Sequence, residues 1–404
     1  MKHSFTSLFL LSFLPVFSQW HEINTPVTDP VTDLFFVNNQ IGYGTTSGGV
    51  ILKTTNGGAS WTDIDIEATY LSSVWFTDES NGFALTTSLT SDRLFYRTTD
   101  GGQNWTKITN LLPIPRGGNQ IVFTDQQTGY IAGATDTIAY LLKSTDGGGS
   151  WQSQGTFTYP LTSVYFFNNN VGFAGDKKGN IFKTTDAGEN WNQVHNAQFD
   201  DVIQGFSFPS ENIGYAVGET NGHVFKTTDG GNNWLETDQI YPSSLGTDIL
   251  FINENVGYIS CFDYNDPYEM LKTTDGGATW TFDASYERNY RGGCMTSRPD
   301  GVLFIGTLEG KILSSQVLSS ADDIPVSTLS VYPNPNTGRL KVANIPETYV
   351  DGQLEVYDVQ GRVVNAFPVT STQLSIKTNL EPGLYHGIIK GEKSQLRLGR
   401  WIVQ

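Results

Sequence analysis

The stretch Thr54-Thr55-Asn56-Gly57-Gly58-Ala59-Ser60-Trp61 is one of six near-identical copies in the chain. The others run over 98–105, 144–151, 184–191, 227–234 and 273–280, and their tryptophans follow one another at intervals of 44, 46, 40, 43 and 46 residues. A period in the forties built from short strands is typical of a β-propeller, in which each repeat forms one four-stranded blade.

Each repeat has the same internal order of apolar runs and turns. In residues 164–194, two apolar runs flank the polar turn Asn168-Asn169-Asn170, a third run covers 180–183, and the box turn leads through Trp191 into a fourth. Short alternating runs separated by Gly, Asn and Asp predict antiparallel strands with tight connections. The chain is therefore expected to be all-β.

Seven apolar first strands can be counted. They are residues 34–36, 74–76, 121–123, 164–166, 206–208, 249–251 and the weaker 294–296. The seventh repeat stops at Ser314-Ser315 without a box, whereas Trp20-His21-Glu22-Ile23 resembles a fourth strand that no blade precedes. Pairing of this N-terminal strand with Leu313 would complete a seventh blade and remove an exposed sheet edge. A seven-bladed β-propeller is the prediction.

The repeated turn has a structural explanation. Asp or Asn accepts backbone N–H bonds within its own turn, Gly supplies a positive φ, and Trp buries a large apolar area between blades. A catalytic acid repeated in six blades would not converge on one site. The residues assigned this structural role are Asn56, Trp61, Asp100, Trp105, Asp146, Trp151, Asp186, Trp191, Asp229, Trp234, Asp275 and Trp280.

The pattern Ser/Thr-x-Asp-x-Gly-x-x-Trp resembles the Asp-box, or BNR repeat, of sialidases, sortilin-type receptors and photosystem II stability/assembly factors. Five copies keep all four residue types in register, and the first has Asn56 in place of Asp. The resemblance implies that the boxes lie on outer turns, away from the centre of the propeller.

A different pattern begins after a polar linker at 318–328. Period-two strands broken by Gly and Pro predict a small immunoglobulin-like β-sandwich of about seven strands. Residues 329–404 resemble the type A C-terminal sorting domain of type IX secretion substrates. The resemblance is carried by Tyr332-Pro333-Asn334-Pro335, by Gly361-Arg362 and by Gly383-x-Tyr385. It implies a Bacteroidetes-type bacterium and the type IX machinery as a partner, with a secreted or surface-attached product; an immunoglobulin-like binding domain is the alternative.

The N-terminus has the features of a signal peptide at 1–18: a short basic start, an apolar run and small residues before Gln19. No other apolar run could span a bilayer, so we expect no transmembrane segment in the mature chain. Domain boundaries are therefore expected at 19–317 for the propeller, 318–328 for the linker and 329–404 for the sorting domain. Cys261 and Cys294 are too few for a disulfide framework, which leaves a single bridge or two buried thiols.

Charge and motifs narrow the function. The net charge of −17 is uneven: residues 327–404 carry 8 Lys/Arg and 6 Asp/Glu, or +2, which leaves −19 for the rest. So acidic a propeller disfavours nucleic acid as a partner. No zinc spacing, nucleophile elbow or phosphate loop occurs, so we expect no cofactor, no metal, no catalytic residue and a monomer.

We therefore expect a binding module for a glycan or a protein, with its ligand at the end of the propeller where second-to-third-strand loops and blade connections gather. The candidate contacts are Asp263, Tyr264, Asp266, Tyr268, Glu269, Arg93, Arg116, Asp176 and Glu219. A glycoside hydrolase is the alternative. Sialidase chemistry needs an Arg cluster, and the propeller has only six Arg; other glycosidases need two carboxylates, which sequence cannot place.

Overall fold

The chain is described by a computed structural model. Described are residues 20–86, 95–108, 118–134, 139–196, 201–219, 222–237, 244–263, 269–283, 291–316, 330–332, 339–343, 350–357, 362–371, 374–377, 380, 383–390 and 395–403. Every regular element in these ranges is a β-strand. Within them no helix has the length and apolar composition to cross a membrane.

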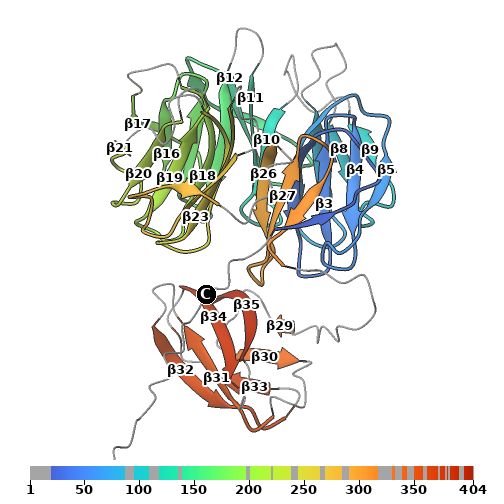
Figure 1. Cartoon of the computed structure of the whole chain (residues 1–404), viewed down its shortest axis with the longest axis vertical. Helices are drawn as coiled ribbons and strands as arrows, with labels where there is room; N and C mark the ends of the chain where they lie inside the picture. The colour runs from blue at the N-terminus through green and yellow to red at the C-terminus, as the bar shows by residue number, and fades with distance from the viewer. Residues whose placement is uncertain are drawn as a thin grey trace, which may run out of the picture.

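Seven four-stranded sheets form the blades of a propeller (Figure 1). Blade 1 contains β2 (Val31–Phe36), β3 (Gly42–Thr46), β4 (Val50–Thr54) and β5 (Thr62–Asp65); blade 2 contains β6 (Leu71–Phe76), β7 (Gly82–Thr86), β8 (Phe95–Thr98) and β9 (Thr106–Ile108); blade 3 contains β10 (Gly118–Phe123), β11 (Gly129–Ala134), β12 (Ala139–Ser144) and β13 (Gln152–Phe157); blade 4 contains β14 (Leu161–Phe166), β15 (Gly172–Asp176), β16 (Ile181–Thr184) and β17 (Asn192–His195).

The remaining blades follow the same order. Blade 5 contains β18 (Ile203–Ser207), β19 (Gly214–Gly218), β20 (Val224–Thr227) and β21 (Leu235–Glu236); blade 6 contains β22 (Ser244–Phe251), β23 (Gly257–Asp263), β24 (Glu269–Thr273) and β25 (Thr281–Phe282); blade 7 contains β26 (Gly292–Ser297), β27 (Leu303–Thr307), β28 (Ile312–Ser314) and, from the other end of the propeller sequence, β1 (His21–Ile23).

Blade 7 is closed by the N-terminal strand, as the sequence predicts. Strand β1 pairs antiparallel with β28, and Glu22 lies opposite Leu313. The first strand of each blade contacts the first strand of the next, and β26 of blade 7 contacts β2 of blade 1. The predicted seven-bladed ring is therefore confirmed.

The antiparallel order gives the propeller two distinct faces. We call the side with the first-to-second-strand turns and the box turns the box face, and the side with the second-to-third-strand loops and the blade connections the loop face. Strand β28 runs towards the box face, where the Ser315 N–H donates to the Leu303 carbonyl at 3.0 Å. The chain therefore leaves the propeller at the box face, at the place where other blades begin their box.

The core lies between blades rather than within one sheet. Seven clusters of buried apolar side chains occur among the described residues, one at each blade interface. At five of these interfaces the ring of a second-strand Tyr or Phe stacks on a Phe at the end of the next blade's first strand, as in Tyr43–Phe76 at 3.6 Å between centroids. The box tryptophan of that blade then meets the same Phe edge-on, as in Phe76–Trp105 at 5.9 Å. Such geometries are the favoured arrangements of aromatic pairs.

The C-terminal segment forms two further sheets. One contains β29 (Ser330–Tyr332), β30 (Arg339–Ala343) and β33 (Leu374–Lys377); the other contains β32 (Val363–Pro368), β31 (Gln353–Tyr357), β34 (Gly383–Lys390) and β35 (Gln395–Val403). Seven strands in two sheets agree with the predicted immunoglobulin-like sandwich. Buried Leu354, Val356 and Ile389 belong to its core.

We expect Trp20→Ala to destabilise the propeller by about 3–5 kcal/mol, the cost of emptying a buried Trp site. The Trp20 side chain is 6% exposed, packs edge-on against Tyr258, and donates its indole N–H to Asp283 Oδ2 at 3.1 Å. Urea denaturation of the full chain measures the effect. Leu235→Ala, at a side chain that is 72% exposed, is the matched control and should change the free energy of unfolding by less than about 0.5 kcal/mol. Equal effects of the two substitutions would contradict ring closure by β1.

Candidate binding site

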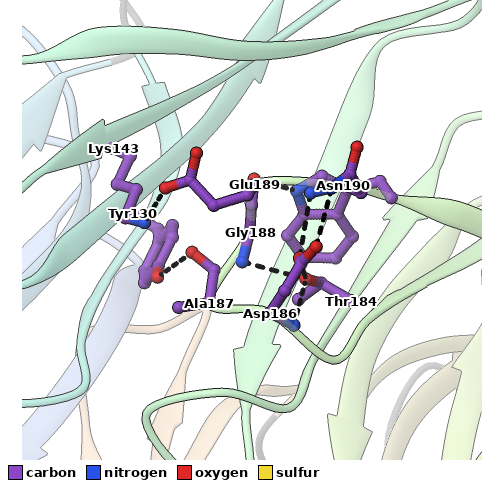
Figure 2. A network of polar contacts seen from close by, with 9 residues as sticks. Tyr130, Lys143, Thr184, Asp186, Ala187, Gly188, Glu189 and Asn190 are labelled. Atoms are coloured by element: carbon purple, nitrogen blue, oxygen red, sulfur yellow. Dashed lines mark hydrogen bonds and ion pairs between the residues drawn. The ribbon is translucent and has the colours of Figure 1, made fainter.

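The box turn is held by three side-chain contacts that repeat from blade to blade. In blade 4, Asp186 Oδ1 accepts the Thr184 hydroxyl at 2.8 Å and the Asn190 N–H at 2.9 Å, and the Gly188 N–H donates to Thr184 Oγ1 at 2.9 Å. Figure 2 shows this network. The corresponding acceptors in the other boxes are Asn56, Asp100, Asp146, Asp229 and Asp275. These are the contacts of a structural turn.

Hydrogen bonding keeps the box carboxylates ionised. The N–H of Asn104, with its side-chain amide, lowers the pKa of Asp100 to about 2, and the side chains of Ser150, Asn233 and Thr279 do the same for Asp146, Asp229 and Asp275. A carboxylate with such a low pKa cannot act as a general acid near neutral pH. Their chemistry therefore excludes these acids from catalysis by proton donation.

Five of the six boxes are also bonded to the preceding blade, as Figure 2 shows for the box of blade 4. The Tyr130 hydroxyl of blade 3 donates to the Ala187 carbonyl at 2.7 Å, and Lys143 Nζ lies 2.5 Å from Glu189 Oε1. Equivalent bonds reach the box carbonyls of Gly57, Gly101, Gly230 and Gly276 from Arg298, Lys53, Lys183 and Lys226. The polar groups of the box face are thus largely used within the ring.

A second circle of bonds joins the first strands. Each first strand has a register shift near its start, and in blades 1, 2, 3, 4 and 6 the residue that follows the shift bonds the neighbouring blade through its side chain. Asp33 Oδ2 accepts the Val74 N–H at 2.9 Å, and Asp248 Oδ2 accepts the Met295 N–H at 2.7 Å. Ser73, Gln120, Ser163 and Cys294 make the corresponding contacts in blades 2, 3, 4 and 7, and Ser207 replaces Gly205 in blade 5.

Two carboxyls in this circle have unusual proton affinity. Burial raises the pKa of Asp33 to about 6 and, with a smaller contribution from the charge of Asp33, raises the pKa of Asp248 to about 7. Cys294 comes from the blade between them, and burial together with these two charges raises the pKa of its thiol. Cys261 and Cys294 are both free, so no bridge joins them. The thiol is therefore unreactive, and the two carboxyls act as links between blades.

The structure describes only part of the predicted ligand site. Tyr264, Asp266, Tyr268, Arg93 and Arg116 lie outside the described residues, and of Asp263 and Glu269 only the strand backbone is described, in β23 and β24. The two remaining candidates lie at the loop face, where Asp176 ends the second strand of blade 4 and Glu219 directly follows that of blade 5.

Asp176 and Glu219 have different surroundings. The Asp176 carboxylate is fully buried and accepts the Lys178 and Asn180 N–H groups of its own turn, so it closes that turn. Glu219 is half-buried, and its Oε2 accepts the Gln204 side-chain amide at 2.9 Å. Of the two, only Glu219 has a side chain that is accessible to solvent. Exposed Tyr159, with Lys178 5.9 Å from its ring centre, lies at the same end of blade 4.

Blade 5 contains a charged cluster that sequence reasoning missed. His223 Nδ1 lies 2.9 Å from Asp201 Oδ2, and His223 Nε2 lies 3.1 Å from Glu236 Oε1. Asp201 and His223 are buried, whereas Glu236 is more than one third exposed. The available signal was a lone His immediately before a third strand, where the equivalent residues of blades 1, 4, 6 and 7 are Val50, Asn180, Glu269 and Lys311.

The sorting motif is partly described. Tyr332 lies in β29, Gly383 and Tyr385 lie in β34, and Arg362 is exposed just before β32. Pro333, Asn334, Pro335 and Gly361 lie outside the described residues.

Two family models match separate parts of the chain. The secretion system C-terminal sorting domain matches residues 330–404, and the photosynthesis system II assembly factor YCF48 matches residues 14–117 and 110–198. No curated protein matches the chain.

Solved structures of other propellers are similar in fold. YCF48 bound to a D1 peptide is 18% identical, with 73% of this chain and 96% of that chain covered and a TM-score of 0.60. PorZ of Porphyromonas gingivalis, described as an essential surface component of the type-IX secretion system, is 12% identical over 95% of this chain and 60% of that chain, at 0.55. A GH74 xyloglucanase from Xanthomonas campestris is 12% identical over 93% and 66%, at 0.59. At such low sequence identity, the structural similarity shows a shared fold alone.

The fold and the repeated turn define a seven-bladed Asp-box propeller. The chain joins such a propeller, similar to YCF48, to a C-terminal sorting domain of the type IX secretion system, which marks it for export.

We expect the melting temperature of the full chain to peak between about pH 4 and pH 6. Acidification below about pH 7.5 stabilises the fold because folded Asp33 and Asp248 bind protons that the unfolded chain, with an ordinary pKa of 3.8, does not yet bind. Below about pH 4 the fold loses stability because box carboxylates with a pKa of about 2 resist a protonation that the unfolded chain accepts.

Differential scanning fluorimetry across this pH range measures the melting temperature on both sides of the maximum, which we call the neutral limb and the acid limb. Asp248→Asn, which imitates the protonated form, should flatten the limb above about pH 5 and leave the acid limb intact. Asp229→Ala should do the reverse, since it removes one low-pKa box carboxylate. An unchanged neutral limb in Asp248→Asn would contradict the assignment.

Proposed function

We propose that the exported propeller is a non-catalytic recognition module that binds a glycan or a protein ligand on its loop face. The observation that carries the proposal is the separation of roles between the two faces. The box face holds the chain exit at Ser315 and boxes whose carbonyls are bonded to the preceding blade. The loop face carries the exposed Tyr159 and the Gln204–Glu219 pair, and no covalent exit.

The route to the cell surface follows from the two ends of the chain. We propose that residues 1–18 act as a signal peptide for the first membrane and that residues 329–404 engage the type IX machinery at the second. The family match over 330–404 supports the second step. Because this segment follows the box face, a chain held by its C-terminal end would direct its loop face away from the point of attachment.

Similarity to YCF48 bound to a D1 peptide supports a protein ligand, because that propeller binds a peptide. The acidic propeller adds a charge argument, since it favours neutral or basic partners and disfavours nucleic acid. Exposed tyrosines at blade connections, Tyr70 and Tyr159, are equally suited to the face of a sugar ring.

Glycoside hydrolysis is the second candidate, favoured by the similarity to a GH74 xyloglucanase. Such chemistry needs two carboxyls about 5–10 Å apart that can reach the sugar. At the loop face, the described Asp176 and Asp201 are buried and hydrogen-bonded, and in the first strands Asp33 and Asp248 are bonded to backbone N–H groups. This use of the described acids favours recognition over hydrolysis.

We expect no release of reducing ends when the purified full chain is incubated with xyloglucan, other β-glucans and sialyllactose. The buried Asp33, Asp176, Asp201 and Asp248 are already bonded within turns, between blades or to His223, which leaves them unsuited to act as an acid/base pair on a sugar. An active xyloglucanase serves as the positive control, and the heat-denatured chain as the blank. Release above the blank that scales with protein concentration would overturn the non-catalytic proposal in favour of the hydrolase.

Binding of the wild-type chain and its variants to glycan and peptide arrays tests which face of the propeller binds the ligand. We expect Glu219→Ala to weaken the strongest array ligand by about tenfold, the equivalent of about 1.4 kcal/mol. Glu211→Ala is the matched control, because it removes the same residue type from the box end of the same blade, where Glu211 is exposed. Loss of binding in Glu211→Ala with retention in Glu219→Ala would place the ligand on the box face and contradict the proposal.

A further inference from the structure

The loop end of blade 5 departs from the pattern of the other blades. Blades 1, 2 and 7 end the second strand with a threonine; in blade 1 the Val50 N–H donates to Thr46 Oγ1, and in blade 7 the Lys311 N–H donates to Thr307 Oγ1, both at 3.0 Å. Blade 5 has Gly218 at this position. A neutral hydroxyl is therefore sufficient to close the turn, and the fold does not require charge here.

Asp201 from the blade 4–blade 5 connection fills the space beside Gly218. A Cβ atom at Gly218 would lie 2.2 Å from Asp201 Oδ2, so the glycine makes room for the carboxylate. Asp201 is 1% exposed and accepts from His223 Nδ1 at 2.9 Å. Removing a carboxylate from water in this way is costly unless it is paired.

The second ring nitrogen of His223 is also occupied. Nε2 lies 3.1 Å from Glu236 Oε1 on the outer strand β21, and His223 itself is 5% exposed at the start of β20. Ionised carboxylates only accept hydrogen bonds, so both ring nitrogens must carry a proton for both contacts to be hydrogen bonds. Only the imidazolium form has two N–H donors.

We propose that His223 is a proton-dependent latch that fastens three segments of blade 5, namely the incoming connection at Asp201, strand β20 and the outer strand at Glu236. With the imidazolium, both charge-assisted bonds are made. Loss of one proton leaves a nitrogen lone pair facing a carboxylate, so one of the two bonds is lost and replaced by repulsion. The latch is closed at lower pH and loosens as pH rises.

The groups that surround the imidazole are consistent with this assignment. Besides Asp201 and Glu236, the Phe225 ring of β20 lies 6.3 Å from the His223 ring. The ring centre of His195 of blade 4 lies 5.0 Å from that of Phe225; burial lowers the pKa of His195, and the charge of Glu236 opposes that shift. The ring of His223 therefore faces two carboxylates, and both histidine rings pack near Phe225.

The latch connects to the surface proposed for the ligand. The connection that carries Asp201 leads into β18, where Val202 accepts the Glu219 N–H at 2.9 Å and Gln204 donates to the Glu219 carboxylate. A movement of Asp201 would therefore be passed to Glu219 through the adjacent Val202 and through Gln204. This consequence rests on the proposed loop-face ligand; the latch itself does not.

The test compares the wild-type chain with His223→Gln by differential scanning fluorimetry between about pH 5 and pH 9. Gln fills the site without an ionisable ring. We expect the variant to melt about 3–8 °C lower at acid pH, the effect of one or two lost charge-assisted bonds in a domain of this size. The difference should shrink as pH rises, and Glu236→Gln, at a side chain that is 39% exposed, should remove part of it.

His195→Gln is the comparison variant, because it removes the neighbouring histidine, for which no ion pair is described at its ring. Burial lowers the pKa of His195, so this variant should differ from the wild type in the opposite sense, gaining relative stability as the pH falls. Nitrogen-15 spectra of the imidazoles in the full chain provide a readout that does not depend on a folded variant: His223 should show two N–H signals when the latch is closed. A single neutral tautomer throughout, or a stability difference independent of pH, would overturn the latch. Both readouts are made without ligand. The latch can therefore be disproved while loop-face binding is supported, and loop-face binding can be disproved while the latch is supported.

Discussion

Closure of the ring depends on the bond that each first strand makes to the next blade. The first strands are the innermost strands of the sheets. The backbone groups on their free edge have no sheet partner within their own blade. A register shift turns one side chain of each strand toward the neighbour, where it meets a backbone N–H or C=O. An unpaired buried N–H costs about 1–3 kcal/mol, so the link is required whichever residue supplies it. Asp, Ser, Gln and Cys all serve.

Blade 7 shows what happens when the repeat is interrupted by the ends of the chain. Its outer strand comes from residues 21–23, and Ser315 occupies the place of a box. Arg298 takes over the role that Lys53 and Lys226 have elsewhere, donating to the Gly57 carbonyl of blade 1 at 2.6 Å. Because β1 supplies the fourth strand of blade 7, the chain leaves the propeller after the third strand, and the linker starts on the box face. The choice of closing strand therefore also decides which face of the propeller is joined to the sorting domain.

Local patterns in the sequence were sufficient to predict the blades. Contacts between residues far apart in the sequence could not be predicted. The spacing of Gly and Trp specifies turns and interface aromatics within a few residues, so the seven first strands and the pairing of β1 with Leu313 could be predicted. Whether a given Asp is exposed or enclosed depends on register: Asp100 and Asp33 are the same residue type, yet hydrogen bonds lower the pKa of one and burial raises that of the other. Asp201 and His223 are 22 residues apart, and only the length of the blade 5 hairpin brings them together.

A repeat protein offers its own internal control for function. A contact present in most blades is explained by the ring, as the box carboxylates and the first-strand links are. What remains unexplained by the ring lies at the loop face of blade 5, where Gly205 lacks a linking side chain, Gln204 bonds Glu219, and a histidine replaces a neutral turn contact. Buried ionisable groups that the fold does not need tend to occur at sites with a separate role. These groups lie on the face opposite the one at which the chain leaves the propeller towards the sorting domain.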